Sequence, residues 1–202
     1  MSIEVAAATT FWDRKTKLLH LGLALFVTFE LFNSLVMQEP ESTAAQQGFG
    51  GIMFEIHEWT GMVALAIVLL HWLWSLWGAS EAGVRHLFPW GSAGRSQIGR
   101  ELRELASLRL PPGGPENRLA GLVHGLGFLA VTGMVLTGVV LFFGIPEGGA
   151  ELTGATQASE EIHEALSTLV WVYWGGHLAM AVLHELLARD GTLHRMFKLA
   201  SV

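Results

Sequence analysis

Four long apolar segments constrain this chain of 202 residues more than any other feature. Each contains about the 20 residues that a helix needs to cross the hydrocarbon core of a bilayer. The composition agrees, because 51% of the residues are hydrophobic and only 15% are charged, which is not typical of a soluble domain. We therefore expect one all-α integral membrane domain over residues 1–202, a bundle of four transmembrane helices at about 18–37, 57–78, 119–143 and 162–188.

The charged residues indicate how such a bundle is oriented. No small-residue cleavage site follows the first apolar segment, so we expect a retained anchor and not a signal peptide. All twelve Lys and Arg residues lie in the head, in the long connection 79–118 or in the tail. The other two connections have no base and seven acids: Glu39, Glu41, Glu55, Glu147, Glu151, Glu160 and Glu161. By the positive-inside rule, both termini and the long connection are cytoplasmic.

The long connection contains a candidate surface helix. Ile98, Leu102 and Leu105 recur at helical spacing among charged residues, a pattern typical of an amphipathic helix. Two interpretations stay open at this point, a helix lying on the membrane surface and a solvated loop helix.

Histidine is the residue type that points to chemistry. The chain has no cysteine, which excludes disulfides, thiolate metal ligands, iron–sulfur clusters and covalently attached c-type haem. It has nine histidines and one tyrosine. Because ionisable side chains are costly within the apolar layer, histidines there are candidate functional residues.

The histidines fall on two levels of the predicted bundle. His57 and His163 begin the second and fourth helices, both of which start outside. His71 and His177 each follow 14 residues later, which is ~21 Å deeper and about 40° from the same helix face. The inner half also contains His20, His124 and His184.

Two levels ~20 Å apart predict two separate sites, and haem suits them better than zinc does. Zinc takes three or four protein ligands, often from a local motif such as H-E-x-x-H; His57-Glu58 and His163-Glu164 lack the second histidine. A haem supplies four equatorial nitrogens and needs only two axial ligands, and bundle cores are common cofactor sites. His57, His163 and His177 are the strongest candidates, whereas the crowded inner level leaves its second ligand open.

Three further features of the sequence, namely glycines, tryptophans and one acidic residue, remain ambiguous at this stage. Gly61, Gly175 and Gly176 stand near candidate ligands, and Gly121 and Gly125 flank His124; such glycines either admit a haem plane or allow close helix contacts. Trp171 and Trp174 lie between the two levels, either beside the haems or simply packed in the core. Glu30, in the first helix, is a candidate for a proton path.

Several of these features together resemble the bacterial di-haem cytochrome b family, which includes cytochrome b561 proteins and the b-type membrane subunits of nickel–iron hydrogenases and formate dehydrogenases. The resemblance covers essentially the whole chain. It is carried by the following motifs: Trp12-Asp13-Arg14 followed by His20, His57 with Gly61, Leu87-Phe88-Pro89-Trp90, Leu110-Pro111-Pro112-Gly113-Gly114-Pro115, and His163-x13-His177.

The resemblance implies two b haems and assigns their ligands. It pairs His57 with His163 at the outer haem and His20 with His177 at the inner haem, with all four as ligands of haem iron. The residues alone also permit His71 with His177, as in the cytochrome b of quinol–cytochrome c oxidoreductases, but many relatives in the shorter family have an arginine at the position of His71. His71, His124 and His184 are then expected near a haem propionate or a quinone.

The expected function is transmembrane electron transfer in the bacterial inner membrane, between the quinone pool and a periplasmic redox partner such as a c-type cytochrome or an enzyme subunit. The expected cofactors are two haems b, with quinone as substrate and the lipid bilayer as surroundings. No catalytic residue and no nucleic-acid partner are expected. The alternative is a stand-alone oxidoreductase at the outer face, a superoxide:quinone oxidoreductase or a ferric reductase.

Overall fold

The computed structural model describes residues 12–38, 48–77, 83–114, 116–146, 152 and 154–198. These residues form helices and no strand. The helices are α1 (Arg14–Asn33), α3 (Phe49–Trp77), α4 (Val84–Leu87), α5 (Ser92–Ala106), α6 (Arg118–Gly144), α7 (Gly154–Leu183), the π-helical turn η1 (His184–Ala188) that continues α7, and α8 (Thr192–Phe197).

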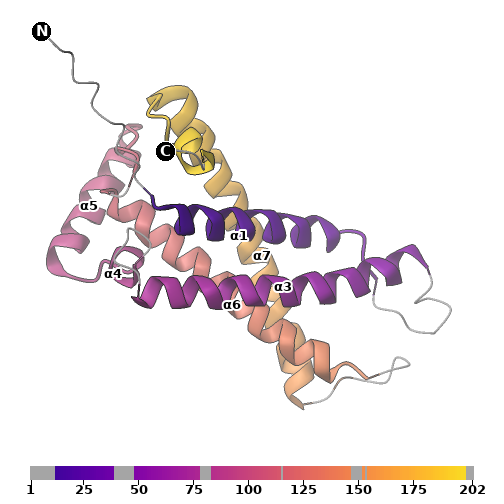
Figure 1. The fold of residues 1–202 in the computed structure, drawn as a ribbon. Coiled ribbons are helices and arrows are strands. Elements are labelled where there is room, and N and C mark those ends of the chain that lie inside the picture. Colours follow the sequence, from indigo (N-terminus) through magenta and orange to yellow (C-terminus); the bar gives the residue numbers. More distant parts are fainter. Residues whose placement is uncertain are drawn as a thin grey trace, which may run out of the picture.

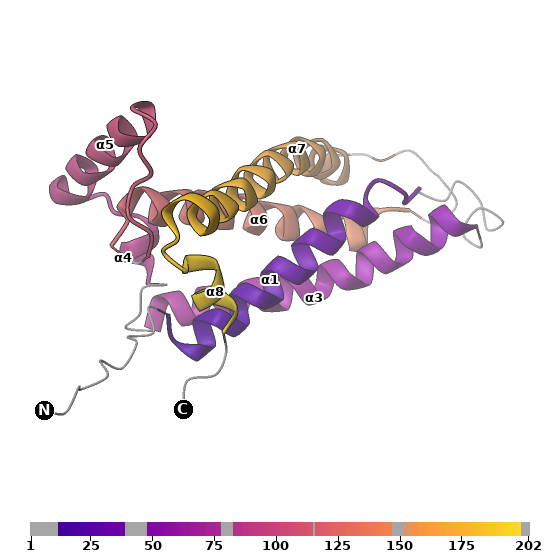
Figure 2. The same cartoon turned by 90° about the horizontal axis from the view of Figure 1, so that it is seen from above.

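The long helices are arranged in two pairs. Helix α1 packs along α3, and α6 packs along α7 (Figure 1). The start of α1, the short helices α4, α5 and α8, and the start of α6 gather at one end of the bundle, which Figure 2 shows from above. The described head, the long connection and the tail therefore lie at the same end, as the distribution of Lys and Arg predicts.

Within the described residues, three helices are long and apolar enough to cross a membrane. They are α3, α6 and the continuous helix Gly154–Ala188. Many large apolar side chains along them face outward, for example Leu69, Leu136 and Val172, as lipid surroundings require. The protein is therefore a multi-pass membrane protein. Helix α1 is not among the three, because it carries three bases and Glu30, and its membrane crossing stays a prediction.

The helix ends differ from the apolar segments of the sequence. Helix α1 ends at Asn33 where the apolar segment extends to 37, and α3 and α7 begin at Phe49 and Gly154, ahead of the expected 57 and 162. For α3 and α7 the physical reason is that backbone hydrogen bonding continues into the polar interface, whereas a hydropathy pattern records only the apolar layer. For α1 the apolar pattern continues past the last helical residue, because hydropathy alone does not mark where a helix ends.

A side-chain cap starts α1. The carboxylate of Asp13 accepts hydrogen bonds from Lys15 N at 2.8 Å and Thr16 N at 3.0 Å, which satisfies amides that have no partner within the helix. Partial burial raises the pKa of Asp13, but the hydrogen bonds from Thr16 and Lys15 outweigh it, and the pKa is lowered. The head motif at Asp13 thus has a structural role in starting the helix that carries His20.

Helix α5 does not match either sequence-based interpretation fully. Leu102, on its apolar face, is exposed, as a membrane-surface helix requires. Glu101 is buried at 2% exposure, and it accepts hydrogen bonds from Leu119 N at 2.7 Å and from Gln97 Nε2 at 2.8 Å. Helix α5 is therefore anchored to the start of α6 by a buried carboxylate.

The structure separates the ambiguous glycines into two groups. A Cβ at Gly121 or Gly125 would meet the carbonyl oxygen of His86 or Leu87 in α4, so these two glycines allow α4 to pack against α6. A Cβ at Gly61, Gly175 or Gly176 would meet nothing within 4 Å. Space beside the backbone is available at these three positions.

An aromatic cluster joins α7 to α1 between the two histidine levels. Trp174 Nε1 donates to Thr28 Oγ1 at 2.9 Å. Trp171 and Trp174 lie with ring centres 5.8 Å apart, and Phe32 contacts both edge-to-face. These contacts fix the rotation of α7 against α1, and with it the direction of the histidines on α7.

Candidate functional site

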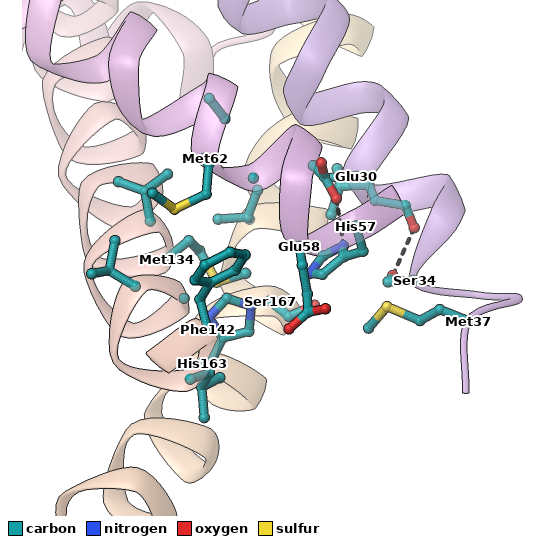
Figure 3. A pocket seen from close by; sticks show the side chains of 18 of the residues that line it. Glu30, Ser34, Met37, His57, Glu58, Met62, Met134, Phe142, His163 and Ser167 are labelled. Carbon is teal, nitrogen blue, oxygen red and sulfur yellow. Dashed lines mark hydrogen bonds and ion pairs between the residues drawn. The ribbon is translucent and has the colours of Figure 1, made fainter. Parts of the chain in front are cut away.

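Two histidines face each other at the outer level. His57 comes from α3 and His163 from α7, and their ring centres lie 6.2 Å apart with the ring planes at 85°. Figure 3 shows both imidazoles turned into the same cavity. They come from helices that are far apart in the sequence, so the fold and not the local chain brings them together.

A second facing pair occupies the inner level. His20 of α1 and His177 of α7 have ring centres 6.1 Å apart at an interplanar angle of 54°. Helix α7 thus supplies one histidine to each pair. His71, the alternative inner candidate, instead packs on Phe128 with ring centres 4.6 Å apart.

The spacing of both pairs fits a metal ion held between two axial imidazoles. A ligating imidazole nitrogen lies about 2.0–2.1 Å from the metal and about 1.1 Å from its own ring centre, so opposite imidazoles have ring centres about 6.2–6.4 Å apart. The observed 6.2 and 6.1 Å are close to that value. Two different helix pairs reproduce it, each with one histidine from α7.

The residues around the outer pair leave room for a flat cofactor. A cavity of about 460 Å³ opens between His57 and His163, within the ~300–1,000 Å³ typical of cofactor pockets. Its walls are mostly apolar, including Val131, Met134 and Phe142, and Gly61 and Gly138 also line it. Since no group of three or more metal-ligating side chains occurs in the described parts of the chain, the pairs suit haem and not a protein-only zinc site.

Each outer histidine has a partner behind it. Thr137 Oγ1 donates to the Gly133 carbonyl at 2.9 Å and lies 2.9 Å from His163 Nδ1. With its hydroxyl proton committed to the carbonyl, Thr137 can accept from His163 Nδ1–H, which leaves His163 Nε2 as the lone-pair nitrogen. His57 Nδ1 is in contact with the carboxylate of Glu30 on α1 (Figure 3).

The remaining inner histidines have different surroundings. His124 lies beside His177, with ring centres 4.9 Å apart, and its Nδ1 is 2.6 Å from the Ala120 carbonyl. His71 is buried, and its Nδ1 has no hydrogen-bond partner among the described residues. His184 lies in η1, and its Nδ1 pairs with Asp190 at 2.8 Å. The fold thus places His71 and His124 around the inner pair, whereas His184 is bound to the tail.

Comparison with known proteins decides the family. A family model for prokaryotic cytochrome b561 matches residues 11–199, nearly the whole chain. The chain belongs to the prokaryotic cytochrome b561 family. Membership implies b-type haem and electron transfer across the membrane, in agreement with the resemblance seen in the sequence motifs. No curated protein and no solved structure matches the chain.

The structure of this cytochrome b561 also brings His86 to the inner level, a residue that the sequence reasoning missed. A Cβ at Gly121 would lie 3.1 Å from His86 Nε2. Burial, followed by the charges of Arg118 and His124, lowers the pKa of His86 to about 4, so its imidazole is neutral at pH 7. The neighbouring Leu87-Phe88-Pro89-Trp90 motif was the available signal, but nothing local indicates that the loop folds back onto α6.

Proposed function

We propose that this cytochrome b561 carries electrons between the membrane quinone pool and a periplasmic redox partner through two b-type haems. His57 and His163 hold the outer haem, and His20 and His177 hold the inner one. The observation that carries the proposal is the pair of facing imidazoles, found twice, each with the ring spacing of two axial ligands. A bound haem supplies reversible one-electron transfer at its iron.

The protein's own residues orient and separate the two sites. Helix α7 contributes His163 and His177, which are 14 residues apart and so ~21 Å apart along the helix axis. Thr137 sets the tautomer of His163 from behind the ring, and such partners fix ring orientation and ligand basicity. By the positive-inside rule, the excess of bases at the end that holds α4, α5 and α8 supports a cytoplasmic location for that end and for both termini.

We place the quinone at the inner level, near His71. Quinone reduction and quinol oxidation transfer protons as well as electrons, and histidine exchanges protons near neutral pH. His71 Nδ1 is buried without a hydrogen-bond partner in the described structure. His71 belongs to α3, which packs against α1, the helix that carries His20 of the inner pair. His124 and His184 are the lesser candidates, because each already has an Nδ1 partner.

His71→Ala should slow reduction of the haems by a quinol analogue about 10–100-fold, because a proton-accepting group is removed. The visible spectrum should stay that of the parent protein, since His71 is not a ligand in this assignment. Stopped-flow reduction by a short-chain ubiquinol, with His184→Ala alongside, measures the effect. His194→Ala is the matched control, because His194 is exposed on α8. Unchanged rates in both His71→Ala and His184→Ala contradict the site.

The outer partner is inferred from charge. Glu160 and Glu161 are exposed at the start of α7, and Glu58 and Glu164 line the cavity at the outer haem site. Four more acids predicted for this face, Glu39, Glu41, Glu147 and Glu151, lie outside the described residues. A negative surface speeds the docking of a basic protein and opposes the approach of small anions, which favours a basic periplasmic cytochrome over superoxide.

Electron exchange with a basic c-type cytochrome should therefore become slower as salt is added. We expect about a tenfold or greater fall in the second-order rate constant between low ionic strength and 0.2 M salt, because the docking fields are screened. Changing Glu147, Glu151, Glu160 and Glu161 together to Gln should flatten this dependence. A rate that is indifferent to salt, or fast reaction with superoxide or a ferric chelate, would instead support the stand-alone oxidoreductase.

A further inference from the structure

A carboxylate lies behind one of the four facing histidines. Glu30 of α1 is in contact with His57 Nδ1, and both side chains are largely buried, at 15% and 20% exposure. Neither carboxylate oxygen of Glu30 has a hydrogen-bond partner in the described structure, and His57 Nδ1 has none either, so the close contact between them is the polar interaction recorded for Glu30. A buried carboxylate without a partner is costly, so its contact with His57 requires an explanation beyond helix packing.

The register of α1 against α3 fixes this contact. Asn33 is 5% exposed, and its Nδ2 donates to the Met53 carbonyl at 2.9 Å, which locks the two antiparallel helices together. One turn back on α1 is Glu30, and one turn onward on α3 is His57. Because residues one turn apart lie on the same helix face, the Asn33–Met53 bond places the carboxylate directly behind the imidazole.

The other facing histidines have no such partner. His163 Nδ1 has the neutral hydroxyl of Thr137 at 2.9 Å, and His20 Nδ1 is buried with no hydrogen-bond partner among the described residues. Within the described structure, His57 is the one member of the two pairs in contact with a carboxylate. The outer site is therefore electrostatically different from the inner site.

We propose that Glu30 is a positioning residue that lowers the reduction potential of the outer haem by accepting the Nδ1 proton of His57. This proposal rests on the proposed function, because it takes His57 as an axial ligand through Nε2. A hydrogen bond to a carboxylate fixes the tautomer and makes the imidazole a more basic, more anionic ligand. Such a ligand stabilises the ferric iron, which carries one more positive charge than the ferrous iron, and the effect is strong where the dielectric constant is low.

The contact also bears on the direction of electron flow. The carboxylate lowers the reduction potential of the outer haem, and the inner pair has no such carboxylate among the described residues. An electron shared by the two haems therefore resides more often on the inner haem. Glu30 thereby favours transfer from the periplasmic partner to quinone.

The test is a spectroelectrochemical redox titration of the purified holoprotein and its Glu30→Gln variant. Gln has the same shape and can still accept from Nδ1, but it has no charge. We expect the potential of one haem to rise in Glu30→Gln by at least 59 mV, which is a tenfold change in the reduced-to-oxidised ratio for one electron. The second haem should not move, and the paramagnetic resonance signal of the haem that moves should shift.

Two controls separate this effect from others. Glu164→Gln removes a carboxylate that lines the same cavity but is not recorded in contact with His57. It therefore measures the effect of a nearby charge without the contact, and it should raise the potential by much less than Glu30→Gln does. Glu30→Asp keeps the charge and should restore a low potential. An equal shift in Glu30→Gln and Glu164→Gln, or no shift in either, overturns the proposal while two haems remain bound.

Loss of haem has its own meaning in this experiment. Suppose that Glu30→Gln loses one haem. If Glu30→Asp keeps that haem at low potential, the proposal is supported. If both variants lose the haem, Glu30 has a merely structural role and the proposal is overturned. A parent protein with no haem, or with only one, contradicts the proposed function instead.

Discussion

His57→Ala and His163→Ala should each leave one low-spin, six-coordinate haem per chain in place of two. Each substitution removes one of two bonds from imidazole to the same iron, so the outer haem, which has no covalent link to the protein, is either lost or converted to a five-coordinate haem on the remaining imidazole. Pyridine haemochrome assays on the purified variants give the haem-to-protein ratio, and paramagnetic resonance distinguishes six-coordinate from five-coordinate haem. His20→Ala and His177→Ala should have the same effect on the inner haem.

Double variants test the pairing itself. If His57 and His163 share one iron, their double Ala variant should keep one six-coordinate haem, no fewer than either single variant, because the second change affects the same haem. His57→Ala combined with His177→Ala should leave no six-coordinate haem. Loss of both haems in His57→Ala/His163→Ala would contradict the pairing.

The matched control is His71→Ala. His71 is buried at the same level as His20 and packs on Phe128, so its removal perturbs the bundle to a similar degree without removing a ligand. We expect two low-spin, six-coordinate haems in this variant by paramagnetic resonance. Loss of a haem in His71→Ala together with retention of two in His20→Ala would reverse the assignment of the inner ligand.

Helix geometry lets the sequence predict the levels of the histidines, but it determines their pairing only partly. Depth follows from the constant rise of a helix, so the 14-residue spacings of His57 with His71 and of His163 with His177 translate directly into two layers. Pairing depends on how each helix is rotated about its axis, which contacts such as Trp174 with Thr28 and Asn33 with Met53 determine. The choice between His20 and His71 therefore needed the resemblance to a family, and the fold places His20 opposite His177.

Polar contacts between segments that are distant in the chain could not be predicted from the sequence. Glu30 was recognised as an unusual charge in an apolar helix, but its partner His57 is on another helix. Glu101 stands among other charged residues in a helix with an apolar face, and that pattern predicts solvation for it. The fold instead buries it at 2% exposure, because the long connection turns back and brings α5 to the first turn of α6.

Glu101→Ala should produce the largest loss of stability of any single change in the long connection. Its carboxylate accepts from Leu119 N at 2.7 Å and from Gln97 Nε2 at 2.8 Å, and a negative charge at a helix start is favoured by the helix dipole. Gln97 Nε2 keeps the Glu116 carbonyl as an acceptor, but losing the hydrogen bonds to a charged acceptor and leaving the Leu119 amide without that acceptor costs about 2–3 kcal/mol. For a domain of this size we expect the melting temperature to fall by about 4–12 °C, measured from the haem absorbance during thermal unfolding in detergent.

Glu104→Ala is the control, because Glu104 lies on the same helix, is only half-buried and makes no side-chain hydrogen bond recorded in the described structure. It should melt within about 1–2 °C of the parent, as a surface change within ±0.5 kcal/mol does. Glu101→Gln keeps one acceptor oxygen and loses the charge, so its melting temperature should lie between those of the parent and Glu101→Ala. Equal melting temperatures for Glu101→Ala and Glu104→Ala would mean that α5 is held by its apolar face in the lipid, and that the buried carboxylate does not anchor it.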